Sequence, residues 1–311
     1  MEGNTKPAES YDPTVYWLAP AQNFRSSGRL HLQHMLCQNT LGFLLHDHVK
    51  RAIPTEPSGV LKVADLACGN GAWLIDLSRK LYKDGVRAEL DGFDVNEILF
   101  PAPAFRPPWV SLKKLDILAK PLPEELIGAY DIVHVRAFVS VIKHAETTPL
   151  LSTVLAMLKP GGWVQWEEMS PNFLIEPSTP TLETSACRIL EERLRADGER
   201  VGLKFDFLPK LDSHLGENGF EYVSIDKSYK RKEDYKAWTD DFLMVWEELT
   251  FRFPPKATMP DATITREFWT EHLVKAIAET EKGVALHAGV IYTAVGHKPV
   301  QDLSLPIHTN Q

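Results

Sequence analysis

Apolar residues along the chain form two kinds of run: short continuous ones and longer ones with helical spacing. Five continuous runs have the length of buried parallel strands, at residues 60–66, 89–95, 109–115, 130–137 and 163–167. Residues 72–81 and 149–158 place apolar side chains three and four positions apart, which predicts helices. The proline-rich stretch 101–108 predicts a short or irregular connection. Strands alternating with helices in this way predict an α/β fold with a doubly wound parallel sheet.

After residue 170 the pattern changes and helical spacing dominates. The spacing predicts helices at 181–201, 206–218, 233–252 and 264–282, and strands at 219–226 and 288–296. The two added strands bring the sheet to seven, and the inserted helices predict a cap over its ligand-binding edge. A further helix is expected before the first strand, over 26–50, capped by Ser26 or Ser27 and ended by Pro54 and Pro57.

Composition and charge exclude several classes of protein. Hydrophobic residues make up 44% and charged residues 24% of the chain, an ordinary globular balance. A net charge of -8 and a pI near 5.8, without a cluster of Lys and Arg, predict no nucleic-acid partner. No apolar run approaches the ~20 residues of a membrane span. Three scattered cysteines, Cys37, Cys68 and Cys187, indicate reduced thiols, so we expect a soluble cytoplasmic protein.

The first predicted strand ends in a glycine turn that has an acid before it. Asp65 closes the strand, Gly69 and Gly71 follow, and a helix begins, so backbone N–H groups can approach a ligand closely. Nicotinamide enzymes, flavoproteins and methyltransferases all use such a turn. The dinucleotide version needs a small residue three positions after the second glycine, but this chain has Leu74. A carboxylate at Asp65 suits S-adenosylmethionine (SAM), which carries an ammonium and a sulfonium, better than a pyrophosphate.

Two further acids stand at the ends of the next two strands. Asp94 closes the second strand, with Val95 beside it, where a carboxylate accepts hydrogen bonds from both ribose hydroxyls of a nucleoside. Asp116 closes the third strand, where it can accept from an adenine amino group while Ile117 packs on the ring. Because the carboxyl ends of parallel strands meet at one edge, these acids predict a single nucleoside site.

Five motifs in register resemble those of class I SAM-dependent methyltransferases. They are VADLACGNG, GFDVNE, LDIL, YDIVHVRAF and LKPGGWVQWEE, and the closing GVIYTAVGHKP looks like the last antiparallel strand of that fold. The opening SSGRLHLQHMLCQNTLGFLLHDHV is similar to a segment of fungal methyltransferases of specialised-metabolite pathways, a group that includes gliotoxin-type N-methyltransferases. The resemblance is close over about 16–170. It implies a seven-stranded Rossmann-like sheet, a helical cap and SAM as the cofactor.

The resemblance and the strand ends together predict the cofactor-binding residues, which are Asp65, Ala67, Gly69, Gly71, Asp94, Val95, Asp116, Ile117 and Arg136. Many relatives carry glycine where this chain has Ala67, a departure that is tolerated if φ stays negative there. Arg136 is expected to pair with Asp131 or with the carboxylate of the cofactor. No metal site is expected, because the acids around the fourth strand do not cluster as in cation-dependent O-methyltransferases.

These assignments divide the chain into segments around one core. We expect a lid and helix at 1–57, the SAM-binding core at 58–170, a cap helix insertion at 171–205, a core helix and strand at 206–228, a helical cap at 229–286, the last core strand at 287–300 and a tail at 301–311.

Methyl transfer from a sulfonium is an in-line displacement that depends above all on alignment and desolvation. A general base helps only when the acceptor must lose a proton. The candidates are His34 on the first helix, His144 after the fourth strand and Glu167 at the end of the fifth. Each also has a structural interpretation: a packed histidine, a surface-loop histidine, and a carboxylate paired with a helix end or with Arg136.

Aromatic residues at helical spacing predict either packed core or a wall of the acceptor pocket. Trp238, Phe242 and Trp246 form one such stripe. Stripes of this kind are mostly core, and the alternative is a pocket for a flat or hydrophobic natural product. Tyr16 and Trp17 are expected to close over the same pocket as part of an amino-terminal lid.

The sequence therefore predicts a SAM-dependent methyltransferase that acts on nitrogen or oxygen of a small molecule, as a monomer or homodimer. Two alternatives stay open at this point. One is a SAM-binding protein that transfers no methyl group, either a regulatory partner or a pericyclase-type enzyme, which would have the same cofactor site. The other is a nicotinamide oxidoreductase, which Leu74 and Asp65 oppose.

Overall fold

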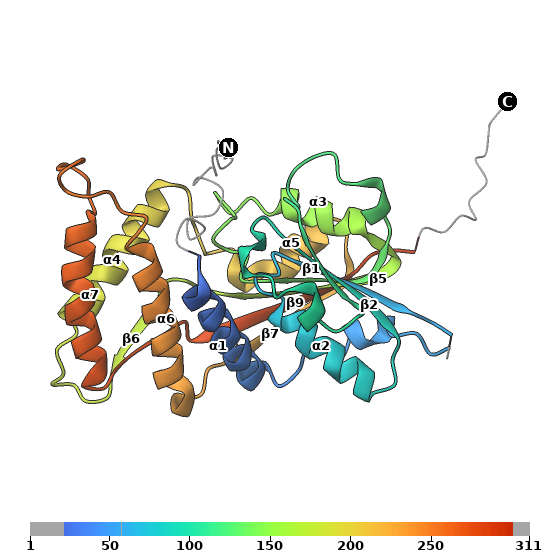
Figure 1. The fold of residues 1–311 in the computed structure, drawn as a ribbon, viewed down its shortest axis with the longest axis horizontal. Helices are drawn as coiled ribbons and strands as arrows, with labels where there is room; N and C mark the ends of the chain where they lie inside the picture. The colour runs from blue at the N-terminus through green and yellow to red at the C-terminus, as the bar shows by residue number, and fades with distance from the viewer. Residues whose placement is uncertain (1–21, 57, 301–311) are drawn as a thin grey trace, which may run out of the picture.

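The computed structural model describes residues 22–56 and 58–300, which form a core built on a sheet and a helical cap at one end (Figure 1). Tyr16 and Trp17, predicted to belong to a lid, lie outside the described residues. No helix within the two described ranges is both long enough and apolar enough to cross a membrane.

A seven-stranded sheet forms the centre of the molecule, as predicted. Its order is β3-β2-β1-β4-β5-β9-β7; the first five strands are parallel, and β9 runs antiparallel to both β5 and β7. The strands are β1 (Leu61–Leu66), β2 (Ala88–Asp94), β3 (Val110–Lys114), β4 (Tyr130–Arg136), β5 (Leu158–Met169), β7 (Glu221–Tyr229) and β9 (Val290–His297). Between β2 and β3 the chain forms two 3₁₀ turns, Glu97–Leu99 and Pro103–Phe105, which confirms the irregular connection. The order reverses between β1 and β4, and ligands bind at such a switch point.

Helices cover both faces of the sheet. On one face, α2 (Ala72–Lys83) buries Trp73 in the same apolar cluster as the inner strands. On the other face, α3 (Thr148–Met157) and α5 (Leu211–Glu217) pack in a second cluster around Trp166 of β5. The carboxyl edge of the sheet is thus left as the open side of the core.

The first helix is shorter than predicted. α1 (Phe24–Leu41) begins after Asn23, whose side chain caps the first turn, and ends at Gly42, which has a φ of 77°. The prediction of a helix over 26–50, capped by Ser26 or Ser27 and ended by prolines, is therefore wrong at both ends. Apolar residues beyond Gly42 continue the helical spacing, but a glycine in the left-handed conformation ends a helix whatever follows.

The cap lies at one end of the sheet, with α1 between the cap helices and the core (Figure 1). Its helices are α4 (Ser185–Arg200), α6 (Tyr235–Leu249) and α7 (Arg266–Glu281). A two-stranded antiparallel sheet of β6 (Leu174–Pro177) and β8 (Val284–His287) joins them. The sequence pattern does not predict this second sheet, because its strands are only four residues long.

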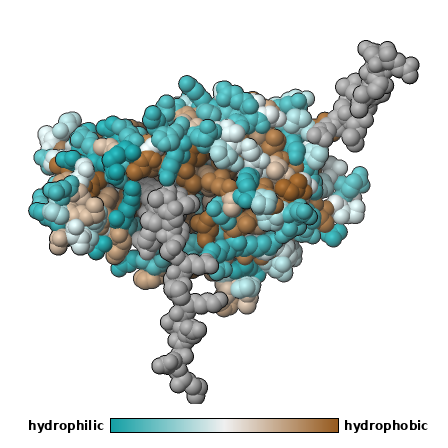
Figure 2. All heavy atoms as spheres, turned by 90° about the horizontal axis from the view of Figure 1, so that it is seen from above, coloured by the Kyte–Doolittle hydropathy of each residue, from teal (hydrophilic) through white to brown (hydrophobic). Residues whose placement is uncertain are grey.

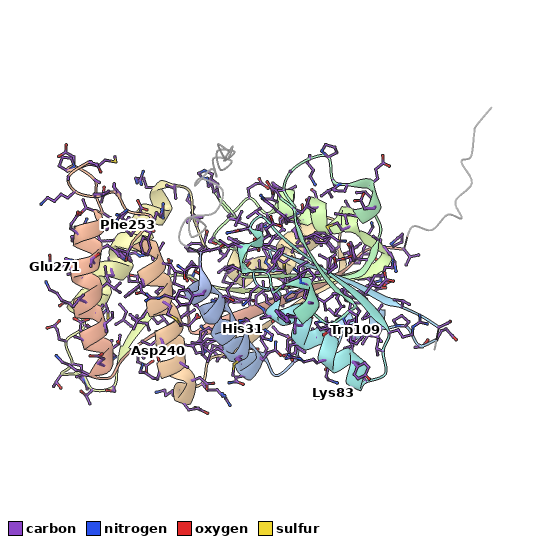
Figure 3. The ribbon with its side chains drawn as sticks, in the orientation of Figure 1. His31, Lys83, Trp109, Asp240, Phe253 and Glu271 are labelled. Atoms are coloured by element: carbon purple, nitrogen blue, oxygen red, sulfur yellow. The ribbon has the colours of Figure 1, made fainter. Side chains whose placement is uncertain are left out.

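The aromatic stripes of the cap are mainly packed core. Trp238 and Trp246 are fully buried, and Trp246 meets Trp269 edge to face with ring centroids 6.2 Å apart. Phe253 packs on Trp269 with ring centroids 4.8 Å apart, at the upper end of the cap (Figure 3).

Seen from above, apolar side chains gather in the middle of the molecule, between two more hydrophilic ends (Figure 2). The middle of the molecule is thus the apolar region of this face.

Candidate active site

A pocket of about 230 Å³ opens at the carboxyl ends of β1, β2, β4 and β5, and α1 and α6 contribute side chains to its wall. Most predicted site residues line it, namely His34, Asp65, Ala67, Gly69, Asp94, Val95, Asp116, Ile117, Arg136 and Phe242. The predicted residues outside the lining are Gly71, His144, Glu167, Trp238 and Trp246. The fold therefore brings four of the five core motifs, and the opening segment that carries His34, to one cavity.

Asp94 and the glycine turn form one hydrogen-bonded unit. Asp94 Oδ2 accepts the Gly69 N–H (2.8 Å), and Oδ1 accepts the Asn96 N–H (3.0 Å). Burial raises the pKa of Asp94 to about 6, although these N–H donors favour the carboxylate. Gly71 is the N-cap residue before α2 and has a φ of 74°, and a Cβ there would come within 2.8 Å of the Leu112 side chain. Gly71 therefore shapes the turn rather than lining the pocket.

Alanines take the left-handed conformation at two strand ends that line the pocket. Ala67 follows β1 with a φ of 55°, and Ala137 follows β4 with a φ of 54°. The condition under which Ala67 would be tolerated without cost, a negative φ, is therefore not met. This conformation costs an alanine on the order of 1 kcal/mol. Backbone bonds beside each turn hold it, from Cys68 N to Phe93 O (3.0 Å) and from Ala137 N to Glu167 O (3.1 Å).

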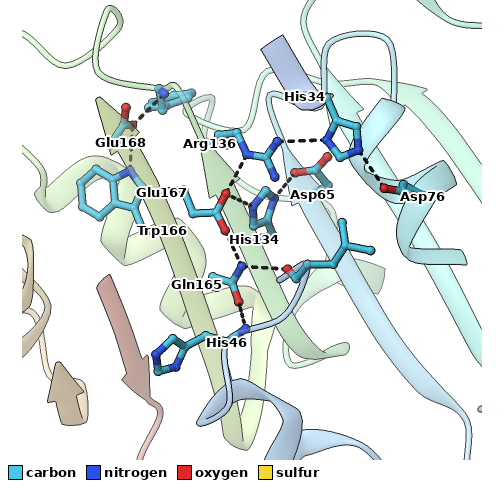
Figure 4. Close-up of polar contacts among 12 residues, drawn as sticks. His34, His46, Asp65, Asp76, His134, Arg136, Gln165, Trp166, Glu167 and Glu168 are labelled. Carbon is cyan, nitrogen blue, oxygen red and sulfur yellow. Dashed lines mark hydrogen bonds and ion pairs between the residues drawn. The ribbon is translucent and has the colours of Figure 1, made fainter. Parts of the chain in front are cut away.

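A buried ionic network joins β1, β4 and β5 at the floor of the pocket (Figure 4). His134 Nδ1 donates to Asp65 Oδ1 (2.7 Å), and the His134 ring stacks on Trp73 with centroids 3.7 Å apart. His134 Nε2 lies 3.5 Å from Glu167 Oε2, which accepts from Arg136 Nε at 2.7 Å. Burial disfavours the imidazolium, but Asp65 and Glu167 outweigh it and raise the pKa of His134 above its ordinary value.

The network gives Asp65 an internal partner that the sequence analysis missed. The carboxylate expected to meet the ammonium of SAM already accepts from His134. The sequence feature that could have indicated this partner is a histidine, His134, inside the apolar run of the fourth strand.

Arg136 pairs with Glu167 and not with Asp131, and its Nη2 has no hydrogen-bond partner in the described part of the chain. A pocket-lining guanidinium with an unused N–H fits a carboxylate.

His34 and Glu167 are poor bases in this arrangement. His34 Nδ1 accepts from Arg136 (3.1 Å) and Nε2 donates to Asp76 (3.1 Å), while burial and Arg136 lower the pKa of His34 to about 4. Burial opposes ionisation of Glu167, yet Arg136 and His134 lower its pKa to about 2. A group with such a pKa accepts a proton weakly at neutral pH. The alternative interpretation of Glu167, a carboxylate paired with Arg136, describes its geometry.

His144 lies outside the pocket, so its placement gives no support to a catalytic role. It is exposed, and its backbone N–H donates to Gly202 O (2.6 Å). The β4–α3 loop reaches the pocket only with residues 137–141 and then turns away. The described residues contain no group of three or more His, Cys, Asp or Glu that could hold a metal ion.

The wall of the pocket beside α6 receives one member of the predicted aromatic stripe. Phe242 lines the pocket and stacks on Phe173 with centroids 4.2 Å apart. Trp238 and Trp246, on the same helix, point into the cap core instead. Phe173, which the sequence analysis missed, follows β5 by a few residues and belongs to the same wall.

Glu168 fixes the loop that carries the pocket residues after β4. Its Oε1 accepts the Phe138 N–H (2.7 Å) and Trp166 Nε1–H (2.8 Å), and the side chain is 1% exposed. Burial raises the pKa of Glu168 to about 8. The carboxyl group is thus mostly protonated in the folded protein at neutral pH.

This raised pKa predicts a stability that falls with rising pH. The unfolded chain loses the Glu168 proton near its ordinary pKa, but the folded chain keeps it to about pH 8, so unfolding releases a proton between these values. Relative to wild type, Glu168→Gln should gain about 3 kcal/mol of unfolding free energy between pH 5.5 and 8.5, measured by urea denaturation. The exposed Glu217→Gln is the control and should follow wild type. If the unfolding free energies of Glu168→Gln and wild type change in parallel with pH, the raised pKa of Glu168 is contradicted.

The strand order and the site geometry together define a class of protein. The β3-β2-β1-β4-β5-β9-β7 order, with β9 antiparallel between β5 and β7, and the glycine turn with acids at successive strand ends are those of a class I methyltransferase fold. No protein-family model matches the chain.

Similarity to known proteins agrees with this class. Methyltransferase grgD of a Penicillium species is 32% identical over 218 residues, which cover 67% of this chain and 70% of grgD. N-methyltransferases tcpN of Claviceps purpurea and verN of Clonostachys rogersoniana are each 32% identical, over 45% and 48% of this chain and 47% and 48% of their own lengths. The chain belongs to the class I SAM-dependent methyltransferases, in the fungal group that contains these proteins. It spans about half the length of the two N-methyltransferases.

Proposed function

We propose that the protein binds SAM in this pocket and transfers its methyl group to a nitrogen or oxygen of a small, largely apolar metabolite. The observation that carries the proposal is the meeting of Asp94, Asp116 and Arg136 in one cavity, with the buried Nη2 of Arg136 left without a partner among the described residues. Their chemistry suits a ribose, an adenine and a carboxylate, respectively. When bound, SAM supplies a methyl group that is already activated by its sulfonium.

Each side chain has a distinct part in holding the cofactor. The Asp94 carboxylate accepts from the ribose hydroxyls, and its two backbone contacts keep it in place. Asp116 accepts from the adenine amino group, with Ile117 against the ring. Arg136, positioned by Glu167 and His34, offers Nη2 to the cofactor carboxylate.

The protein's contribution to the reaction is alignment and exclusion of water, because His34 and Glu167 are poor bases here. The acceptor must then enter with a lone pair available, and the proton it loses passes to solvent. An amine that is neutral at the working pH meets this condition. Nitrogen is therefore the favoured acceptor atom, which agrees with the names of tcpN and verN.

We also propose a cytoplasmic location, supported by the free thiols of Cys37, Cys68 and Cys187.

Two measurements test the proposal. Calorimetric titration with S-adenosylhomocysteine (SAH) should give micromolar binding, and incubation with methyl-labelled SAM and fungal small-molecule extracts should label an apolar metabolite. Binding without transfer to any acceptor would support the alternative of a SAM-binding protein that does not methylate. Absence of SAH binding would overturn the cofactor site itself.

A further inference from the structure

One face of α1 supplies three polar side chains to the pocket, and two of them are fully engaged by the protein. Arg29 donates from Nε to Glu248 Oε1 (2.9 Å) and from Nη2 to Glu248 Oε2 (3.4 Å). His34 uses both ring nitrogens, one toward Arg136 and one toward Asp76. The third side chain, Gln33, has one half of its amide engaged.

Asp241 of α6 determines which half of the Gln33 amide remains for a ligand. Gln33 Nε2 donates to Asp241 Oδ2 (3.3 Å), and no donor among the described residues forms a hydrogen bond to Gln33 Oε1. A carboxylate only accepts hydrogen bonds, so the amide must present its NH₂ to Asp241 and its carbonyl oxygen elsewhere. Asp241 is fully buried on its helix, so water does not compete with Gln33 for its carboxylate. The Gln33 amide therefore keeps this orientation. Burial raises the pKa of Asp241 to about 6, while Arg29 and the Gln33 hydrogen bond oppose this shift, so the group is mainly a carboxylate at neutral pH.

Apolar side chains make up much of the pocket that Gln33 lines. The stacked pair Phe173 and Phe242 forms one wall of the pocket, with Val245 on the same helix as Phe242. Phe138 and Val141, on the loop after β4, add further apolar lining. In such a site a carbonyl oxygen left without a donor loses the bond it makes in water, so a ligand that cannot donate is disfavoured.

We infer that Gln33 Oε1 is a specificity-determining group of the acceptor site, and that it selects flat, apolar molecules that carry an N–H or O–H. Asp241 acts as the positioning residue that turns the carbonyl oxygen of Gln33 toward the ligand. The inference rests on the proposed function. It takes the part of the pocket that is not lined by the cofactor residues to be the binding site of the acceptor.

An isosteric pair of probes tests this selection without needing the natural acceptor. Indole carries an N–H donor, whereas benzofuran has the same shape with oxygen in its place. Titrated into the SAH-loaded protein, indole should bind about tenfold tighter than benzofuran to the wild type. Gln33→Met should reduce this ratio to about one, while Gln38→Met, the same change on the same helix outside the pocket lining, should keep it.

A second pair of variants tests the positioning role of Asp241. Asp241→Asn allows the Gln33 amide to turn, so the ratio should fall although Gln33 is intact. Asp240→Asn changes a neighbouring acid that is 45% exposed and pairs with Lys236 on the surface of α6 (Figure 3), and it should leave the ratio unchanged. Equal binding of the two probes to wild type, or no binding of indole to the loaded protein, would overturn the inference. SAH binding is measured first in the same sample, so failure of the cofactor site is recognised separately.

Discussion

Asp94→Ala is expected to weaken SAH binding by at least about 100-fold. The wild-type carboxylate accepts from two ribose hydroxyls in the proposed complex, and charge-assisted hydrogen bonds contribute about 1.5–3 kcal/mol each. Loss of both amounts to about 3 kcal/mol or more, or two orders of magnitude in affinity. The substitution also releases the Gly69 N–H, which Asp94 holds at 2.8 Å. Isothermal titration measures the change directly.

The control for this variant lies on the same strand. Asp91 accepts from Tyr130 Oη (2.9 Å) and pairs with Lys113 (3.0 Å), away from the pocket. Asp91→Ala should therefore leave SAH affinity within about twofold of wild type.

The SAH affinity of the wild type should also depend on pH. Because the pKa of Asp94 is about 6, this affinity should fall as the pH drops below this value, when the carboxyl loses acceptor capacity. Asp94→Asn should show no such fall. An unchanged affinity in Asp94→Ala would remove the residue from the cofactor site.

Arg136→Leu is expected to destabilise the fold by about 3–5 kcal/mol. The substitution leaves Glu167 ionised, fully buried and without its 2.7 Å guanidinium partner. Breaking a buried pair from one side carries this cost because the remaining carboxylate is out of contact with water and keeps, among the described residues, only His134, at 3.5 Å, and the Gln165 amide as partners. Urea denaturation monitored by tryptophan fluorescence measures the loss.

A double variant distinguishes the loss of the pair from the loss of packing. Arg136→Leu combined with Glu167→Leu removes both charges, so it should be more stable than Arg136→Leu alone. The exposed pair Arg25–Glu247, at 3.1 Å, gives the matched comparison: Arg25→Leu should cost less than about 1 kcal/mol. If the costs of the two Leu substitutions simply add, the pair is not a coupled ionic unit.

The strands of the core could be predicted because buried parallel strands are continuous apolar runs. The run at 130–137, for example, becomes β4 (Tyr130–Arg136). The end of α1 could not be predicted from the apolar pattern alone, because that pattern continues beyond Gly42. The strand β8 (Val284–His287) was missed since it lies directly before β9 and is short.

The contacts at the floor of the pocket depend on register, which one sequence does not provide. β1 and β4 pair so that Asp65 stands opposite His134, and β4 and β5 pair so that Arg136 stands opposite Glu167. A shift of either register by one residue would turn these side chains to opposite faces. The sequence therefore predicts which acids belong to the site, but not that a histidine neutralises the first of them.

The position of β9 in the sheet imposes an order on folding. Among the described strands, β7 pairs only with β9, yet the cap helices α6 and α7 separate the two in the chain. β7 therefore cannot join the sheet until the cap segments have been synthesised, and until then β5 presents an unpaired edge. Pairings of such long sequence separation form slowly. The interval between the emergence of β5 and that of β9 from the ribosome is thus the period in which nascent chains are most exposed to strand exchange and aggregation.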